Sequence, residues 1–264
     1  LLNQPPAIET AFQTISPACY GGDNGVITID TITGIGSPFE FSIDGEFFSS
    51  ITDFPYSINS VAAGNYELTI QDINDCITTE NIYIEVPTLN VVDLGQDITI
   101  SLGESTQLDA VLNFDSATVI WNNPDINCLG CLDPVVMPFE TTNYSILVTD
   151  SLGCSATDDV MVFVKKDRNI FIPSVFSPNA DGLNDQFFVN ADQSVISISK
   201  FRIFNRWGET IYSIDDIAPN DSSVGWNGDF KGKAMNPGVF VYLVEVQFTD
   251  GQSAVYKGGI TLVK

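Results

Sequence analysis

Apolar and polar residues alternate with a period of two along much of the chain. The alternation is clearest in residues 25–34 (GVITIDTITG), 39–44 (FEFSID) and 65–72 (NYELTIQD). A period of two is typical of antiparallel strands that bury one face and expose the other. No segment has the sustained i, i+3, i+4, i+7 apolar spacing of an amphipathic helix. The pattern therefore predicts an all-β chain.

Three strand-rich segments follow one another, each closed by a linker-like stretch. We place them at residues 1–88, 89–166 and 167–264. The first two share an internal repeat, GNYELTIQDINDC (64–76) and TNYSILVTDSLGC (142–154). Both copies contain Asn-Tyr, a strand, an Asp, and a Cys after three further residues. Because modules of this size suit tandem sandwiches, we predict three Ig-like antiparallel β-sandwich domains.

Charge is distributed unevenly along the chain. The net charge is −24, and all ten Lys and Arg residues lie at or after Lys165. Asp and Glu number 23 in residues 1–164 and 11 in residues 165–264, so the two parts carry 0 − 23 = −23 and 10 − 11 = −1. A region without cations cannot neutralise phosphate, which excludes nucleic acid as a partner. The acidic part is typical of a solvated extracellular surface, with shielding by divalent cations as the alternative.

The absence of histidine restricts the chemistry that the chain can perform. The sequence contains no histidine, so Ser-His and Cys-His nucleophiles are excluded. A carboxylate pair among the 34 acids stays open, but we predict that the chain is not an enzyme. No apolar run reaches the roughly 18 residues of a membrane-spanning helix. The chain opens LLNQPPAIET, without Met or a charged leader, so we expect a fragment of a longer precursor.

Five cysteines are present, and we interpret them as disulfide-forming residues of an oxidising compartment. Zinc is disfavoured because there is no histidine and only one C-x-x-C. Cys19 and Cys76 bracket the first segment, and a bond between them would remove about 4 kcal/mol of unfolded-chain entropy. For the other three cysteines we predict Cys128 with Cys131, with Cys154 bonded to either of them as the alternative.

A row of cations marks residues 200–207 (KFRIFNRW). If this stretch is a strand, Phe201, Ile203, Asn205 and Trp207 share one face. The other face carries the four residues Lys200, Arg202, Phe204 and Arg206. A solvated outer face is one interpretation. The other is a docking face for a partner protein, because Arg and aromatic residues are enriched at interface hot spots.

The loop 177–185 (SPNADGLND) has oxygen-bearing side chains at alternate positions. Asn179, Asp181 and Asp185, with the Leu183 carbonyl, follow the spacing of calcium loops. Calcium is therefore a candidate cofactor. The alternative is an ordinary Asx turn, because no Glu stands at the twelfth position and further ligands are needed.

The first two segments resemble known surface modules. ISPACYGGDNGVITIDTITG followed by AAGNYELTIQDINDC looks like the repeat of SprB-type gliding adhesins of Bacteroidetes. LGQDITISLGESTQLDA with WNNPDINCLGCLDP and TTNYSILVTDSLGC is similar to Ig-like or PKD-like modules. Both resemblances imply stalk or adhesive modules.

The third segment resembles the gliding motility-associated C-terminal domain, the type B signal of the type IX secretion system. The resemblance rests on IFIPSVFSPNADGLNDQF, FRIFNRWGETIYS, GWNGDFKGKAMNPGVFVYLVEV and YKGGITLVK. It implies a folded β-sandwich that directs export and holds the protein at the outer-membrane cell surface. It also implies three partners, namely the type IX translocon, its shuttle protein and a PorP/SprF-like outer-membrane protein.

Two hypotheses for function follow from these observations. In the first, residues 1–166 are stalk modules and residues 167–264 are the secretion and anchoring domain. In the second, the upstream modules bind a carbohydrate or protein ligand, with calcium as a possible requirement, through exposed aromatic side chains such as Trp121, Trp226 or Tyr56.

Overall fold

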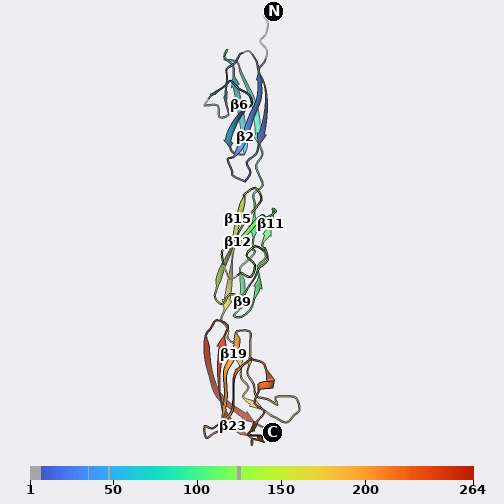
Figure 1. The fold of residues 1–264 in the computed structure, drawn as a ribbon, viewed down its shortest axis with the longest axis vertical. Helices are drawn as coiled ribbons and strands as arrows, with labels where there is room; N and C mark the ends of the chain where they lie inside the picture. Colours follow the sequence, from blue (N-terminus) through green and yellow to red (C-terminus); the bar gives the residue numbers. More distant parts are fainter. Residues whose placement is uncertain (1–6, 35, 47, 124–125) are drawn as a thin grey trace, which may run out of the picture. The chain divides into compact units, whose positions relative to one another are not determined.

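The computed structural model describes residues 7–34, 36–46, 48–123 and 126–264 (Figure 1). Strands make up its regular structure, and the helical content of the described residues is one 3-10 turn, η1 (Ser222–Val224). The predicted all-β class is therefore confirmed. No helix in the described part of the chain is long and apolar enough to cross a membrane.

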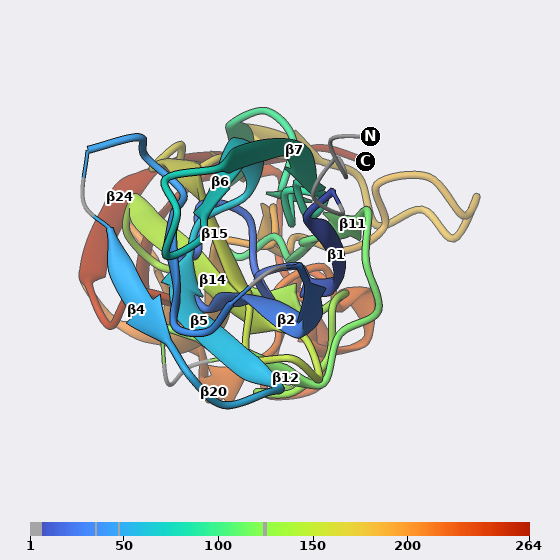
Figure 2. The same cartoon turned by 90° about the horizontal axis from the view of Figure 1, so that it is seen from above.

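Two antiparallel sheets form the N-terminal segment (Figures 1 and 2). Leu68 and Ile70 of one sheet and Ile27 and Ile29 of the other are completely buried in a single hydrophobic core. The pairing of two inner faces around one core is the sandwich arrangement that the alternating pattern predicts. The first sheet has the order β1 (Glu9–Ile15), β2 (Gly25–Thr33), β5 (Tyr56–Val61), and the second β4 (Ser49–Ile51), β3 (Phe39–Ser42), β6 (Gly64–Gln71), β7 (Ile77–Ile84).

Shorter strands dominate the middle segment. Its largest sheet has the order β12 (Thr118–Trp121), β14 (Thr142–Thr149), β15 (Ser155–Lys165), β9 (Ile98–Ser101), and β15 and β9 run parallel. The two small ribbons are β8 (Val92–Asp93) with β11 (Val111–Leu112), and β10 (Thr106–Gln107) with β13 (Val135–Val136).

A five-stranded sheet is the main element of the C-terminal segment. Its order is β17 (Val175–Phe176), β24 (Ser253–Leu262), β23 (Gly238–Phe248), β19 (Val195–Phe204), β20 (Thr210–Ile217). Two ribbons accompany it, β16 (Ile170–Phe171) with β18 (Asn190–Ala191), and β21 (Asp229–Phe230) with β22 (Lys233–Ala234). The last strand, β24, lies inside the sheet, hydrogen-bonded to β23 on one side and to β17 on the other.

Aromatic rings fill the core beneath this sheet. Trp226 is completely buried and lies 5.1 Å from Phe176 and 5.0 Å from Phe240, measured between ring centroids. Phe187 extends the chain of ring contacts to Phe201 at 5.6 Å. Such edge and tilted ring pairs add about 0.5–1.5 kcal/mol each beyond the area they bury. All buried members of this core lie between residues 176 and 262.

Each sheet lies within one of the three predicted segments. The division of the chain into compact units is different. In the described residues each sheet takes its strands from within residues 9–84, 92–165 or 170–262. The chain separates into two compact units, and the middle segment is divided between them. The first unit comprises Leu1–Asp93, Val111–Ile120 and Leu147–Asp158, and the second Leu94–Ala110, Trp121–Ile146 and Asp159–Lys264. The boundaries 1–88, 89–166 and 167–264 therefore stay a prediction.

The predicted disulfide between Cys19 and Cys76 is wrong, because Cys19 is bonded to Cys154 with a Cα–Cα distance of 5.4 Å. Cys19 lies in the loop before β2, whose first residue, Gly25, pairs with Val61. β6 starts just after Val61 and runs eight residues away from this end before the turn that carries Cys76. A strand of that length spans about 26 Å. A disulfide requires Cα atoms within about 7 Å, so these two cysteines cannot meet.

The predicted bond between Cys128 and Cys131 is also absent, and both thiols are free. The Cys131 Sγ donates a hydrogen bond to the Cys128 carbonyl over 3.2 Å. Burial, with the Cys128 thiol as a further cause, raises the pKa of Cys131. The alternative pairing of Cys154 with either residue is excluded by its bond to Cys19.

Candidate functional site

The outer face of the five-stranded sheet carries a mixed apolar and basic surface. Residues directly opposite one another on neighbouring strands share a face. Phe204, Val241 and Gly259 form one such row across β19, β23 and β24. Val241 is 49% exposed. Its neighbour in the row, Gly259, has no side chain that could cover Val241. This row is therefore an accessible apolar strip, which we call the outer strip.

Cations flank the outer strip in the next two rows. Arg202 lies opposite Leu243 and, beyond it, Lys257. Lys200 lies opposite Glu245 in the following row. The prediction that Lys200, Arg202 and Phe204 share one face is thus consistent with the register, since Phe201 and Ile203 between them are completely buried.

Two of the predicted cations are neutralised by acidic neighbours. The Lys200 Nζ lies 2.8 Å from the Glu245 Oε2, and this hydrogen bond raises the pKa of Lys200. The Arg202 guanidinium lies 2.6 Å from an Asp215 carboxylate oxygen and also donates to the Ile214 carbonyl over 2.8 Å. These contacts orient the side chains, so the face presents ordered ion pairs and not a field of positive charge.

The predicted row does not extend to Arg206, because the strand ends at Phe204. The Asn205 Oδ1 accepts hydrogen bonds from the amides of Trp207 (2.9 Å) and Glu209 (3.0 Å), which closes an Asx turn. Gly208 completes the turn at φ +80°, a conformation that favours glycine. Arg206 is exposed in this turn.

Trp207 is 86% exposed, although the alternation placed it on the face of Phe201 and Ile203. The turn fixes its backbone, so the indole is held out into solvent. A recess of about 280 Å³ adjoins it, lined by residues 205–207 and 234–240. An exposed Trp beside a recess is typical of a protein-binding surface.

In the loop 177–185 the oxygen atoms proposed for calcium accept hydrogen bonds from within the loop. The Asp185 carboxylate accepts the amides of Asn179 (2.9 Å), Ala180 (2.7 Å) and Gly182 (2.8 Å). The hydrogen bond from Gly182, with those of the other amides, holds the pKa of Asp185 below its ordinary value, although burial opposes this.

The other ligands proposed for this loop are arranged in the same way. The Asp181 carboxylate accepts the Leu183 amide over 2.7 Å and the Asn179 Nδ2 over 3.0 Å. Leu183 itself is 71% exposed. A cation would share these oxygens with the N–H groups that already point at them, because an ionised carboxylate has about four lone-pair sites. Among the described residues there is no group of three or more Cys, Asp or Glu side chains arranged to hold a metal ion. The geometry supports the Asx turn, and calcium binding stays a prediction.

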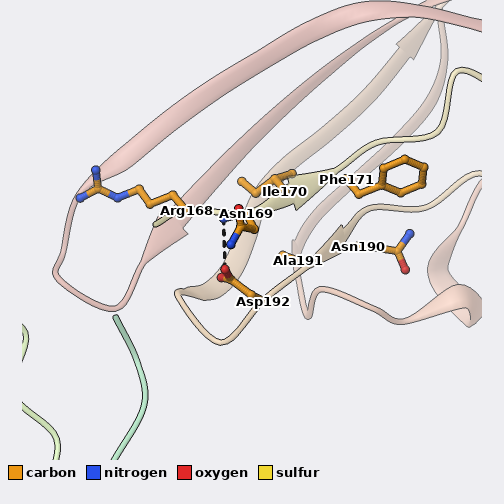
Figure 3. A pocket seen from close by; sticks show the side chains of 7 residues that line it. All are labelled: Arg168, Asn169, Ile170, Phe171, Asn190, Ala191 and Asp192. Atoms are coloured by element: carbon orange, nitrogen blue, oxygen red, sulfur yellow. Dashed lines mark hydrogen bonds between the residues drawn. The ribbon is translucent and has the colours of Figure 1, made fainter. Parts of the chain in front are cut away.

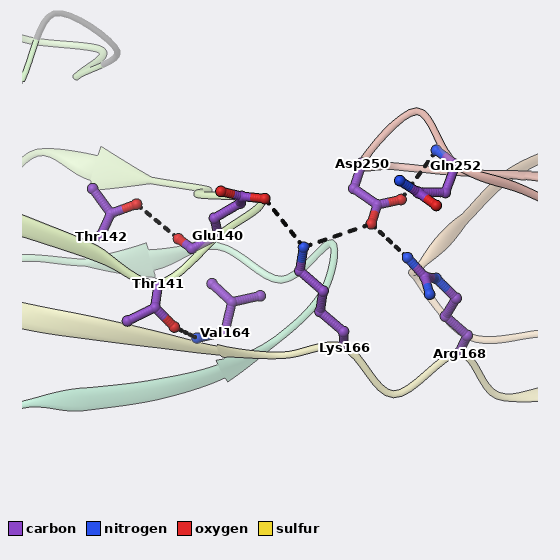
Figure 4. A network of polar contacts seen from close by, with 8 residues as sticks. All are labelled: Glu140, Thr141, Thr142, Val164, Lys166, Arg168, Asp250 and Gln252. Atoms are coloured by element: carbon purple, nitrogen blue, oxygen red, sulfur yellow. Dashed lines mark hydrogen bonds and ion pairs between the residues drawn. The ribbon is translucent and has the colours of Figure 1, made fainter.

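The basic linker before the C-terminal sheet is fixed by ion pairs (Figure 4). The Arg168 Nη2 lies 2.6 Å from the Asp250 Oδ2, and its guanidinium lies 4.7 Å from the Phe248 ring centroid. The Lys166 Nζ lies 3.3 Å from Glu140 and 3.9 Å from Asp250. Although burial opposes ionisation, the Gln252 amide and the Arg168 guanidinium hold the pKa of Asp250 below its ordinary value.

An open pocket of about 450 Å³ lies beside this linker and is lined by residues 168–171 and 190–192 (Figure 3). Its lining includes the exposed Phe171 and the carboxylate of Asp192. That carboxylate accepts the amides of Asn169 (3.1 Å) and Ser194 (2.9 Å). These hydrogen bonds fix the position of the Asp192 carboxylate.

The aromatic residues considered for ligand binding are mostly inside the protein. Trp121 is 5% exposed and donates its Nε1 hydrogen to the Cys131 carbonyl over 2.9 Å. Trp226 is completely buried and donates to the Asp229 carbonyl over 2.9 Å. Tyr56 is half-buried, with its ring in edge contact with Phe41. The two Trp side chains therefore cannot stack on a sugar.

Comparison with known families identifies the C-terminal segment. Residues 170–262 match the CHU_C Type IX secretion signal domain. The matched range coincides with the five-stranded sheet and its aromatic core. The resemblance of this segment to a type IX secretion signal domain is thereby confirmed. No curated protein matches the chain in sequence.

Solved structures similar to the chain are tandem modules of low sequence identity. A 1.5-MDa bacterial ice-binding adhesin, described for its host cell surface retention, is 13% identical, with 99% of each chain covered and a TM-score of 0.38. A tetra-tandem repeat from the extending region of a large adhesion protein is 12% identical, covering 98% of this chain and 75% of that one, with a TM-score of 0.32. The fibronectin(III)-like modules of Clostridium thermocellum CbhA are 16% identical, covering 61% and 95%, with a TM-score of 0.26. At these scores the similarities assign no function.

Proposed function

We propose that residues 170–262 act as a secretion signal that the type IX machinery reads as a folded domain. The observation that carries this proposal is the coincidence of two boundaries. The signal-domain match covers residues 170–262, and all buried members of one hydrophobic core lie inside that range. A segment with its own core can fold as a unit.

The position of the last strand supports recognition of the folded state. β24 contributes the completely buried Ile260 and the nearly buried Leu262 to the core. Because these residues come at the end of the segment, the core is complete only when the whole segment is available. The machinery would then receive a finished sheet.

For the docking surface we propose the outer strip together with the Trp207 turn. Val241 and Trp207 supply exposed apolar area, and Phe204 between them is half-buried. Beside them, Arg202 and Lys200 are held by ion pairs with Asp215 and Glu245. Interfaces of this composition concentrate their binding energy in a few aromatic and Arg residues. The partners we propose are the type IX translocon, its shuttle protein and a PorP/SprF-like outer-membrane protein. The destination is the outer-membrane-associated cell surface.

For residues 1–166 we propose a stalk of SprB-repeat-like and Ig/PKD-like modules belonging to a surface adhesin. The net charge of −23 up to residue 164 supports a well-solvated spacer. In the alternative, a ligand-binding module, Trp121 and Trp226 cannot contact the ligand because both side chains are buried. We infer no enzymatic role, since the sequence has no histidine. A glycan array with residues 1–166 separates the two hypotheses, because a stalk binds no glycan.

Calcium binding at Asn179, Asp181, Leu183 and Asp185 stays a prediction that calorimetry can decide. Calcium would be titrated into the whole chain and into an Asp181→Asn variant. Heat and a higher melting temperature in the parent chain alone would support the site. Identical traces for the two proteins would leave the Asx turn as the whole explanation.

The secretion proposal is tested by fusing residues 167–264 to a reporter enzyme in a gliding bacterium. We expect the reporter at the cell surface, where added protease removes it from intact cells. A fusion to residues 1–166 is the matched control and should stay inside the cell envelope. Retention of the 167–264 fusion in the periplasm would contradict the proposal.

A further inference from the structure

Two turns of the chain share one set of hydrogen bonds between an Asp and the backbone, and the second turn also receives hydrogen bonds from the Asn90 side chain. In the turn after β6, the Asp72 Oδ1 accepts the amides two and four residues further on, at 2.8 and 2.9 Å. In the turn after β14, the Asp150 Oδ1 accepts the corresponding amides at 2.8 and 2.9 Å. In both turns the Asp amide donates to the carbonyl of the closing cysteine, Cys76 or Cys154, at 3.0 Å. The two cysteines are therefore structurally equivalent.

The strands that lead into these turns extend the equivalence. Tyr66 of β6 and Tyr144 of β14 each stand six residues before the Asp, which stands four residues before the cysteine. The residue before the cysteine has positive φ in both turns, Asp75 at 61° and Gly153 at 88°. Asp tolerates this conformation at a cost that Gly does not have, so the geometry is maintained across different sequences.

The two equivalent cysteines differ in their partners. Cys154 is 8% exposed and bonded to Cys19, which lies in the loop between β1 and β2. Cys76 is exposed and free. Two apolar residues beside it, Ile73 and Ile77, are 63% and 61% exposed. Cys76 is thus exposed between two exposed apolar side chains, whereas the equivalent Cys154 is buried in its disulfide.

We propose that Cys76 forms a disulfide of the Cys19–Cys154 type with a cysteine outside residues 1–264. The partner is a cysteine on an opening loop of the Pro-Ala-Cys-Tyr-Gly-Gly kind found at residues 17–22. Within the chain, Cys19 is already bonded, and the Cys131 thiol is directed to the Cys128 carbonyl. Neither Cys128 nor Cys131 lies in a loop of that sequence. The observation that carries the proposal is the bonded state of the equivalent residue, Cys154.

The covalent step is an oxidation by thiol–disulfide exchange. The Cys76 thiolate attacks one sulfur of a small-molecule or oxidoreductase disulfide, and that disulfide's other sulfur leaves as a thiolate. The partner cysteine, as its thiolate, then displaces the remaining carrier sulfur from Cys76. Two protons and two electrons leave the protein thiols, and the carrier disulfide is reduced to two thiols. Repetition of this bond would link each closing turn to the opening loop of another module.

Disulfide mapping of the intact protein tests the proposal. The protein is purified from its host, wherever in the cell it is found, alkylated with iodoacetamide before any reduction, and digested for mass spectrometry. We expect the Cys19–Cys154 peptide pair as an internal control. We also expect Cys76 linked to a peptide that is absent from residues 1–264. Cys76 recovered alkylated, linked to Cys128 or Cys131, or linked to a second Cys76 overturns the proposal.

A variant in the host gives a second measurement. Cys76→Ser removes an exposed side chain, so the fold is retained, and it leaves the partner thiol free. We expect one new alkylated cysteine outside residues 1–264 compared with the parent protein. Cys131→Ser is the matched control and should give no new site outside this range. The same alkylation pattern in the parent and in Cys76→Ser overturns the proposal. Neither measurement involves export of a reporter. A failure of the disulfide proposal can therefore be distinguished from a failure of the secretion proposal.

Discussion

Residues 7–165 and residues 170–262 are both β-structures, but they are stabilised by different means. The N-terminal core is mainly aliphatic, with residues such as Ile27, Leu68 and Ile82, and the region contains all five cysteines. The C-terminal core is built on ring contacts among Phe and Trp side chains, and that region contains no cysteine. The first region combines an aliphatic core with a covalent bond between distant turns, whereas the second has an aromatic core and no cysteine.

The difference fits the two proposed functions, a spacer in residues 1–166 and a secretion signal in residues 170–262. A spacer gains from cross-links that keep neighbouring turns together, whereas a signal must be complete within its own residues. Most of the predictions below change one side of this comparison and leave the other side as the control, and the acid prediction compares the two sides directly.

The largest effect is expected for a charge placed in the C-terminal core. Ile260→Asp buries a carboxylate where the side chain is completely buried, and no cation lies in the core to pair with it. We expect a loss of more than about 4 kcal/mol in the free energy of unfolding of this region. Val255→Asp on the same strand, at a position 57% exposed, is the matched control and should change stability by less than about 1 kcal/mol. Circular dichroism of the two variants during urea unfolding measures both. Equal losses would contradict the assignment of the core.

The next effect concerns the disulfide. Cys154→Ser opens a loop with a sequence separation of 135, for which the chain-entropy model gives about 5 kcal/mol. We expect the N-terminal melting transition to move to lower temperature while the C-terminal transition stays in place. Differential scanning calorimetry separates the two transitions. Cys128→Ser is the control, and a shift as large as that of Cys154→Ser would contradict the pairing.

Acid is expected to weaken both regions through the Asp residues that cap their turns. The Cys76 amide holds the pKa of Asp72 below its ordinary value of 3.8, and the Asn90 amide group does the same for Asp150. In the C-terminal region the Gly182 amide lowers the pKa of Asp185. A lowered folded-state pKa contributes stability that is present above pH 3.8 and is lost as the pH falls below it.

Melting temperatures measured between pH 6 and pH 2 check this expectation. The decrease should begin near pH 4, and Asp185→Asn should reduce it for the C-terminal transition alone. A decrease that begins between pH 5 and pH 7 would contradict the assignment to these carboxylates.

The smallest effect is expected at the surface ion pairs beside the outer strip. Lys200 is exposed and paired with Glu245, so Lys200→Met should change the free energy of unfolding by no more than about 1 kcal/mol.

Export of a fused reporter should respond more strongly to Trp207→Ala than to Lys200→Met. The Trp207 indole is 86% exposed, so its loss should weaken docking while it changes the core little. Surface labelling of the reporter, together with thermal melting, measures the two effects. An export defect for Trp207→Ala that appears only with loss of folding would remove the docking role.

The sequence was sufficient for the class of fold and for one face of β19. The period-two alternation predicts strands, and Phe201 and Ile203 are completely buried as the pattern requires. The position of Trp207 was not predictable from alternation alone, because the Asx turn at Asn205 ends the strand. The Asn-x-x-Gly spacing was the available signal for that turn.

Disulfide pairing shows a different limit of sequence reasoning. The internal repeat located both closing cysteines, Cys76 and Cys154, in the right local structure. Their partners depend on which end of a strand each turn occupies, and spacing along the chain does not contain that information. Sequence reasoning has a similar limit at the loop 177–185. The oxygen atoms that suit a cation also accept backbone amides in an Asx turn, so the spacing of these residues does not distinguish the two.

The most direct test of the central claim compares export with folding in one strand. A reporter fused to residues 167–264 would carry either Ile260→Asp or Val255→Asp, and surface exposure on intact gliding bacteria would be measured by protease shaving. A signal read as a folded domain predicts that Val255→Asp is exported like the parent, while Ile260→Asp remains in the periplasm. Surface display of the unfolded Ile260→Asp fusion at the parental level would contradict the account.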